Sequence, residues 1–217
     1  MKNAAPRRAL VWWRARALSV LVSACLVALL SLGQGPALAT EITQFQVERV
    51  DEGLAISTQL RFDLPPVVED ALLKGIPLFF VVEADTYRDR WYWTDQRVAS
   101  TARTIRLAYQ PLTRRWRVNV ASGVISSSGG LRATLNQNYD SLEEALTGIQ
   151  RLARWKFADN PELSPDGAYR VEFSFRLDLS QLPRPFQIGV AGQSDWVIAA
   201  QFKERIRPEV LRAEPAR

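Results

Sequence analysis

The stretch YRVEFSFRLDLS, residues 169–180, indicates most clearly how this chain folds. Apolar and polar side chains alternate along it without a break, and the apolar members include Phe173 and Phe175. A period of two is the pattern of a β-strand with one buried face and one face in water. We therefore expect a half-buried strand whose neighbours are antiparallel, because antiparallel sheets commonly keep one face in solvent.

Seven further segments have the spacing or composition of strands: 43–47, 54–62, 77–87, 98–109, 115–121, 131–136 and 195–205. The first two flank an Asp51-Glu52-Gly53 turn and predict an antiparallel hairpin. The fourth and fifth predict a second hairpin around Pro111-Leu112-Thr113. The third is apolar on both faces, so we expect a central strand that is buried on both sides.

Two segments predict helices. Residues 67–74 fit two helical turns, with Pro66 near the first position and Gly75 as a C-cap. Ser141 and Glu144 have the spacing of a capping box, and the apolar residues that follow at helical spacing extend this longer helix to near Trp155.

About eight strands with one long and one short helix favour a mainly β fold. We expect an antiparallel β-sandwich, for which an immunoglobulin-like topology stays open. A β-barrel built from the same strands is the alternative.

Residues 1–39 have the three parts of a secretory signal. Five cations are followed by an unbroken apolar run from Ala17 to Leu30 and then by Ala37-Leu38-Ala39, an A-x-A-like cleavage site. We expect cleavage between Ala39 and Thr40 and a periplasmic or secreted product. This predicts a single β-rich domain over residues 40–205 and a disordered tail over residues 206–217.

Three other interpretations of the N-terminal segment stay open. Residues 17–33 would serve as an inner-membrane anchor, although they are shorter than the ~20 apolar residues that usually span a bilayer. Cys25 follows small residues as in a lipoprotein, although the apolar run continues beyond it. A helix of the folded core is the third interpretation, and five preceding cations with no acid disfavour it.

The composition after residue 39 excludes several classes of function. The five cations of the signal account for the whole net charge, so the remaining chain has 23 Lys+Arg (28 minus 5) against 23 Asp+Glu. This neutral balance argues against a nucleic-acid partner. The chain has no histidine, and its one cysteine is Cys25, which excludes Ser-His-Asp and Cys-His catalysis and the usual zinc, copper and haem ligands. We expect a protein that is not an enzyme and needs no cofactor; a hydrolase using carboxylates alone is the less favoured alternative.

The first candidate binding feature is a segment without acids between Gln96 and Tyr139. If the second hairpin turns at its centre, Arg106 lies opposite Asn119, and Arg106, Arg115 and Arg117 share the outward face. Guanidinium groups bind carboxylates and phosphates bidentately. The face therefore predicts an envelope protein with acidic residues, or an anionic lipid or glycan, as the partner. Ion pairing with acids of neighbouring strands is the structural alternative.

Trp91 and Trp93 form the second candidate, because strand alternation places both on one face. Exposed aromatic rings beside Asp and Arg provide a stacking platform for sugars or a hot spot for a protein partner. The alternative is that both tryptophans belong to the core.

An acidic loop is the third candidate, with Asp159, Asn160, Glu162 and Asp166 as oxygen ligands for calcium. The spacing is not that of an EF-hand, and Asn-Pro and Pro-Asp-Gly are ordinary turn sequences. We therefore expect no metal site.

Four motifs together resemble a family of exported proteobacterial proteins, the domain-of-unknown-function family number 4390, sometimes labelled proline-rich signal peptide protein. They are Glu41-Ile42-Thr43 after the A-x-A site, the strand from Pro77 to Glu83, Trp91-Tyr92-Trp93, and the helix start from Tyr139 to Leu146. The resemblance covers nearly the whole mature chain and carries no active site. Members are often encoded beside a sensor histidine kinase, which implies a binding role accessory to envelope sensing.

Overall fold

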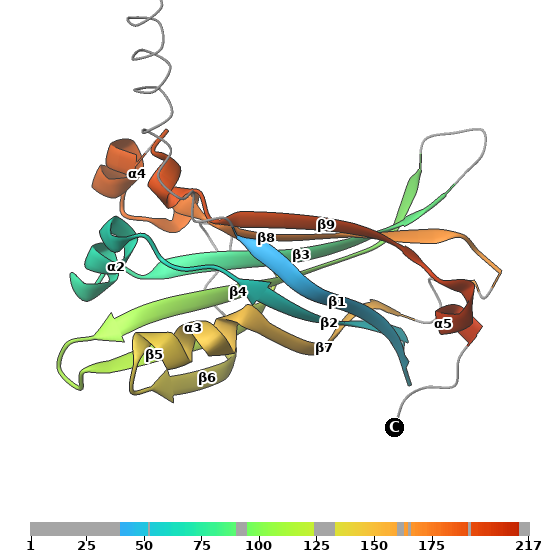
Figure 1. Ribbon diagram of the computed structural model, residues 1–217, viewed down its shortest axis with the longest axis horizontal. Coiled ribbons are helices and arrows are strands. Elements are labelled where there is room, and N and C mark those ends of the chain that lie inside the picture. Colours follow the sequence, from blue (N-terminus) through green and yellow to red (C-terminus); the bar gives the residue numbers. More distant parts are fainter. Residues whose placement is uncertain are drawn as a thin grey trace, which may run out of the picture. The chain divides into compact units, whose positions relative to one another are not determined.

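The computed structural model describes residues 40–51, 53–89, 95–123, 133–159, 163–164, 166–190 and 192–212. This part is mainly β and forms two open antiparallel sheets (Figure 1). The smaller sheet has the order β1-β2-β7 and the larger has the order β6-β5-β4-β3-β8-β9. The strands are β1 (Glu41–Val50), β2 (Gly53–Arg61), β3 (Leu78–Arg88), β4 (Gln96–Gln110), β5 (Arg115–Ser122), β6 (Ala133–Tyr139), β7 (Arg151–Asp159), β8 (Tyr169–Leu177) and β9 (Ala199–Ile206).

The described helices are α2 (Pro66–Leu73), α3 (Leu142–Gln150), α4 (Arg184–Val190) and α5 (Pro208–Arg212), with short 3₁₀ turns at Leu179–Gln181 and Ser194–Trp196. As predicted, α2 begins at a proline and is followed by Gly75, whose φ of 84° suits the end of a helix. In the described part of the chain, no helix combines the length and the apolar character needed to cross a membrane.

The predicted strand pattern is confirmed at the centre of the larger sheet. β8 buries its apolar positions and leaves the intervening ones partly exposed, as the alternation of residues 169–177 indicates. β3 lies between β4 and β8, and Leu78 to Val82 are buried on both faces. A strand in this position needs apolar residues on both sides, because both faces of the sheet are covered there.

Aromatic side chains join the two sheets into a sandwich. Phe62, directly after β2, lies 5.6 Å from Phe80 of β3 and 5.2 Å from Phe175 of β8 between ring centroids. Phe80 and Phe175 stack at 5.4 Å with an interplanar angle of 12°. Apolar residues of both sheets form one continuous core around them.

The immunoglobulin-like topology left open by the sequence is not the observed one. The larger sheet is a meander over β3, β4, β5 and β6, extended by β8 and β9. Each of these four strands pairs with the next one in the chain, whereas an immunoglobulin domain exchanges strands between its sheets by Greek-key connections.

The prediction of one helix reaching Trp155 is wrong. α3 ends at Gln150, and β7 begins at Arg151 and pairs with β2. The positive φ of Arg154 (47°) accompanies an irregularity in the β2–β7 register, so that Leu152 and Trp155 face the core three residues apart. A β-bulge inserts one extra residue into a strand. The resulting spacing of three residues between buried side chains resembles the spacing along one face of a helix.

The expectation of a disordered tail from residue 206 is wrong for the residues described. β9 extends to Ile206, and α5 follows it with Leu211 buried at 2% exposure. Arg49 Nη1 donates a hydrogen bond of 2.5 Å to the carbonyl oxygen of Leu211, and Arg212 pairs with Asp166 at 2.8 Å. Burial of one leucine and these two contacts hold a segment whose composition resembles a tail.

The predicted capping box at α3 allows a direct test. Ser141 Oγ accepts a hydrogen bond of 3.1 Å from the backbone N–H of Glu144, and the Glu144 carboxylate accepts one of 3.3 Å from the N–H of Asp140. Ser141→Ala should lower the free energy of unfolding by about 1 kcal/mol, because it removes the cap. Urea unfolding followed by circular dichroism measures the loss. Thr147→Ala, an exposed position of the same helix, is the control, and an equal loss in both variants would contradict the capping role.

Candidate functional site

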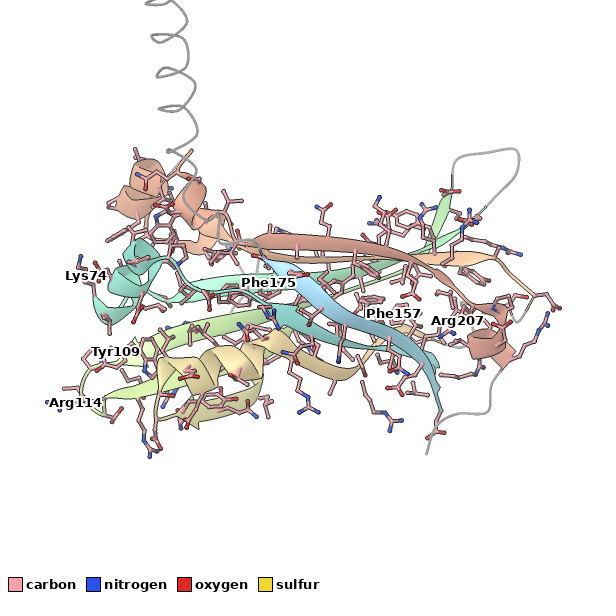
Figure 2. All side chains as sticks on the ribbon, in the orientation of Figure 1. Lys74, Tyr109, Arg114, Phe157, Phe175 and Arg207 are labelled. Carbon is pink, nitrogen blue, oxygen red and sulfur yellow. The ribbon has the colours of Figure 1, made fainter. Side chains whose placement is uncertain are left out.

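The second hairpin has the predicted register. Arg106 lies opposite Asn119, and Arg117 lies opposite Ala108. Ile105, Leu107, Trp116 and Val118 are buried on the side that faces the core. Arg106, Arg115 and Arg117 therefore share the outward face of the larger sheet, and we call these three residues the outer arginine face. Figure 2 shows Tyr109 and Arg114 at the tip of this hairpin.

Neutral groups, rather than carboxylates, hold most of the outer arginine face. Arg117 Nε donates a hydrogen bond of 3.2 Å to the side-chain oxygen of Asn138, and the Arg106 guanidinium lies 6.0 Å from the ring centroid of Phe79. Arg115 pairs with Asp140 at 2.9 Å, and both side chains are more than half exposed. Within the described chain, Arg106 and Arg117 form no ion pair.

The other half of the same sheet face is different, because its cations are neutralised. Arg170 Nη2 lies 3.0 Å from Asp95, and the same guanidinium bonds to Asp89 and Glu172 at 3.2 Å. The hydrogen bond to Asp95 is the main cause that raises the pKa of Arg170. Further pairs on this half are Arg97–Asp85, Arg176–Glu83, Lys203–Glu172 and Arg205–Asp89. Ion pairing within the fold thus explains the cations of this half of the face, and it also explains Arg115.

Several predicted site residues lie outside the residues that the structure describes. Trp91 and Trp93 are among them, so their exposure stays a prediction. Ala39 is also outside, whereas Thr40 is the first described residue, and cleavage between the two stays a prediction.

The acidic loop does not come together as a metal site in its described part. Asp159 pairs with Lys156 at 3.0 Å and Asp166 pairs with Arg212 at 2.8 Å, while Asn160 and Glu162 are not described. Among the described Asp and Glu residues, no group of three is placed to hold a metal ion.

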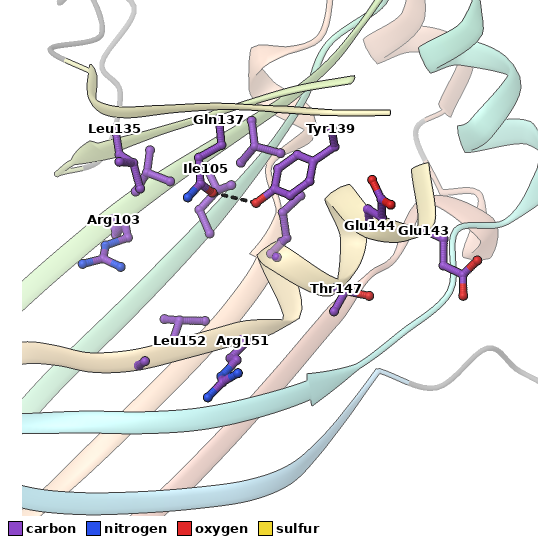
Figure 3. Close-up of a pocket in the computed structure, with 15 residues that line it drawn as sticks. Arg103, Ile105, Leu135, Gln137, Tyr139, Glu143, Glu144, Thr147, Arg151 and Leu152 are labelled. Carbon is purple, nitrogen blue, oxygen red and sulfur yellow. Dashed lines mark hydrogen bonds between the residues drawn. The ribbon is translucent and has the colours of Figure 1, made fainter. Parts of the chain in front are cut away.

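A groove that the sequence pattern did not predict lies on the inward side of the sheet. A cavity of about 690 Å³ lies between the inner face of β4, β5 and β6 and the opposing α3 and start of β7 (Figure 3). Its walls are mostly apolar and include Ile105, Val118 and Leu152, which are almost fully buried. Leu135 of β6 is 49% exposed at the open side.

Arg103 is the unusual residue of the groove. It lies two positions before Ile105, so the alternation of β4 places it on the inward face among apolar side chains. Its guanidinium lies 5.3 Å from the ring centroid of Trp155. Burial lowers the pKa of Arg103 from the usual arginine value. The sequence feature that could have revealed this site was a cation at position 103 of an otherwise apolar strand face.

Tyr139 forms part of the groove wall and leans toward α3. Its hydroxyl donates a hydrogen bond of 2.6 Å to the side-chain oxygen of Gln137 (Figure 3). The hydroxyl also occupies the space that a Cβ of residue 148 would need, so glycine at that position lets the ring pack against the helix. In Figure 3, Arg103 lies at one end of the groove and Glu143 and Glu144 lie at the other.

A family model described as a domain of unknown function, DUF4390, matches residues 37–205. This chain belongs to the DUF4390 family. The match confirms the resemblance stated from the sequence motifs and covers every described strand of the DUF4390 domain up to Arg205 in β9. No curated protein and no solved structure matches this DUF4390 protein significantly.

Proposed function

We propose that this DUF4390 protein is an exported binding module of the bacterial envelope that uses the outer arginine face to hold an acidic partner protein. The signal-like segment before Thr40 supports an envelope location. The lack of histidine in the chain, and of cysteine after residue 25, supports a binding role over catalysis.

The observation that carries the proposal is the uneven charge of one sheet face. Arginines on β8 and its neighbours are paired with carboxylates, whereas Arg106 and Arg117 are positioned by a ring and an amide. A guanidinium held by neutral groups keeps its charge for an incoming carboxylate, and it binds one bidentately. Charge complementarity of this kind steers association and selects partners more than it adds raw affinity.

The proposed partner is a protein with an acidic face in the same compartment. The outward surface of a sensor kinase is one candidate, as the family resemblance implies. Trp91 and Trp93, which stand between β3 and β4 in the sequence, are a second candidate contact point.

An anionic envelope lipid or glycan is the second candidate ligand. It is favoured by the same arginines, because phosphate groups also accept bidentate bonds from guanidinium. Salt separates the two candidates. Binding dominated by phosphates should weaken steeply as ionic strength rises and screens the charges, whereas a partly buried protein interface should weaken less.

The test is crosslinking of the exported, tagged protein in intact envelopes, followed by purification and identification of the bound partner. Changing Arg106, Arg115 and Arg117 together to alanine should weaken capture of a specific partner by about tenfold or more, since each ten-fold corresponds to about 1.4 kcal/mol. Repeating the capture at raised salt distinguishes a protein from an anionic lipid or glycan.

The matched control removes three exposed arginines elsewhere: Arg61, Arg184 and Arg207. This variant loses the same charge and should capture the partner like the unchanged protein. Equal loss in both triple variants would indicate a general charge effect. Full capture of the partner by the outer-face variant would contradict the proposal and would make Trp91 and Trp93 the next residues to test.

A further inference from the structure

We infer that the groove beside α3 binds a single-chain amphiphile with a carboxylate head, such as a free fatty acid. The inference is independent of the outer arginine face, because the groove lies on the opposite side of the same sheet. Three observations carry it: the cation at one end, the apolar walls, and the acids at the other end.

The cation is Arg103. It is partly buried, and its guanidinium lies 5.3 Å from the ring centroid of Trp155. The described part of the chain offers its guanidinium neither a carboxylate nor a hydrogen-bond acceptor. A buried charge is costly unless it is paired, so an anion that enters the groove relieves this cost.

The walls suit an alkyl chain. Ile105, Val118, Ile149 and Leu152 each expose less than a tenth of their surface and form the floor, while Leu135 is 49% exposed at the edge. The volume of about 690 Å³ lies within the roughly 300–1,000 Å³ of small-molecule sites. Removing an alkyl chain and this exposed leucine from water would stabilise the complex.

The two ends of the groove give the ligand a direction. Arg103 lies at one end, and Glu143 and Glu144 lie at the other (Figure 3). The Glu144 carboxylate is already an acceptor for the N–H of Asp140. An anionic head is therefore attracted to Arg103 and repelled from the α3 end, so the chain runs from the head at Arg103 along the apolar floor.

A carboxylate fits better than a phosphate monoester. One guanidinium fork matches the two oxygens of one carboxylate, and a single partly buried cation balances one negative charge. A phosphate monoester carries about 1.5 to 2 negative charges near neutral pH, which would leave charge uncompensated beside apolar walls.

The test is isothermal titration of the purified full chain with laurate below its micelle concentration. Acetate has the head without the tail, and lauryl alcohol has the tail without the charge. We expect laurate to bind at least about tenfold more tightly than either, because a charge-assisted hydrogen bond and the apolar burial each contribute about that factor or more.

Two variants locate the site. Arg103→Gln should weaken laurate binding by about tenfold to a hundredfold through loss of the charged bond. Leu135→Glu places a negative charge at the exposed edge of the apolar wall and should weaken binding at least tenfold as well. Because Leu135 is half exposed, this variant keeps the test decisive if loss of Arg103 unfolds the protein. Arg97→Gln, on the same strand but on the outward face, is the matched control and should bind laurate normally.

The following results would overturn the inference: no heat of binding with laurate, equal affinity for lauryl alcohol or acetate, or normal laurate binding in both groove variants. Tighter binding of lauryl phosphate than of laurate would overturn the assignment of a carboxylate head.

Discussion

Replacing Phe175 with alanine should lower the free energy of unfolding by about 3–5 kcal/mol, the cost of removing a fully buried phenylalanine ring and leaving a cavity. Phe175 has no exposed surface. Its ring lies 5.4 Å from Phe80 within the larger sheet and 5.2 Å from Phe62 at the end of β2. The ring therefore contributes to packing within the larger sheet and between the two sheets.

Urea unfolding monitored by circular dichroism measures this loss, provided that one cooperative transition is seen. Phe202→Ala is the control, because it removes the same atoms from a ring that is 37% exposed and packs against Phe45 at 4.8 Å. The control should lose clearly less stability. Equal losses would mean that the aromatic cluster between the sheets is not where the stability is concentrated.

Replacing Gly53 with alanine should cost about 3 kcal/mol or more, because the new methyl group would collide with backbone and not with an adjustable side chain. A Cβ on this residue would overlap the carbonyl oxygen of Ala158 and lie 3.0 Å from the Cα of Asp159. Gly53 pairs with Val50 across the first hairpin and with Asp159 of β7. Alanine there must push β7 away from β2.

Gly123→Ala separates this collision from the cost of an unusual backbone angle. Gly123 has a φ of 89° and open space around the position of a Cβ, so alanine there should cost only about 1–2 kcal/mol. Thermal and urea unfolding of both variants give the comparison. A Gly53 variant no less stable than the Gly123 variant would show that β7 yields without cost.

Local alternation predicted much of the larger sheet and the placement of the outer arginine face. Successive side chains of a strand point to opposite faces, so the identities of residues 98–121 and the position of their turn were enough to pair Arg106 with Asn119. The same rule identified β8 as half buried and β3 as buried on both faces.

The secondary-structure predictions were wrong where a local pattern resembles that of another element, or where contacts between residues distant in the chain determine the structure. The bulge near Arg154 made β7 look helical, although pairing with β2 is what holds it as a strand. α5 is held by Arg49, which lies 162 residues earlier in the chain than its acceptor, Leu211. No local periodicity reports such a contact.

For this protein, the sequence by itself determined which side chains share a face of regularly alternating strands such as β3, β4, β5 and β8, the helix cap at Ser141, and the charge balance after residue 39. The strand faces and the helix cap depend on residues close together in the chain, and the charge balance depends on composition alone. Only the tertiary structure decided which arginines are neutralised, and that Arg103 lines an apolar groove bordered by α3. Those properties depend on side chains that are far apart in the chain and meet only in the folded protein, from β4 to β7 for the groove and from β3 to β9 for the ion pairs. Strand alternation specifies which face a side chain occupies, but not which side chains lie opposite that face.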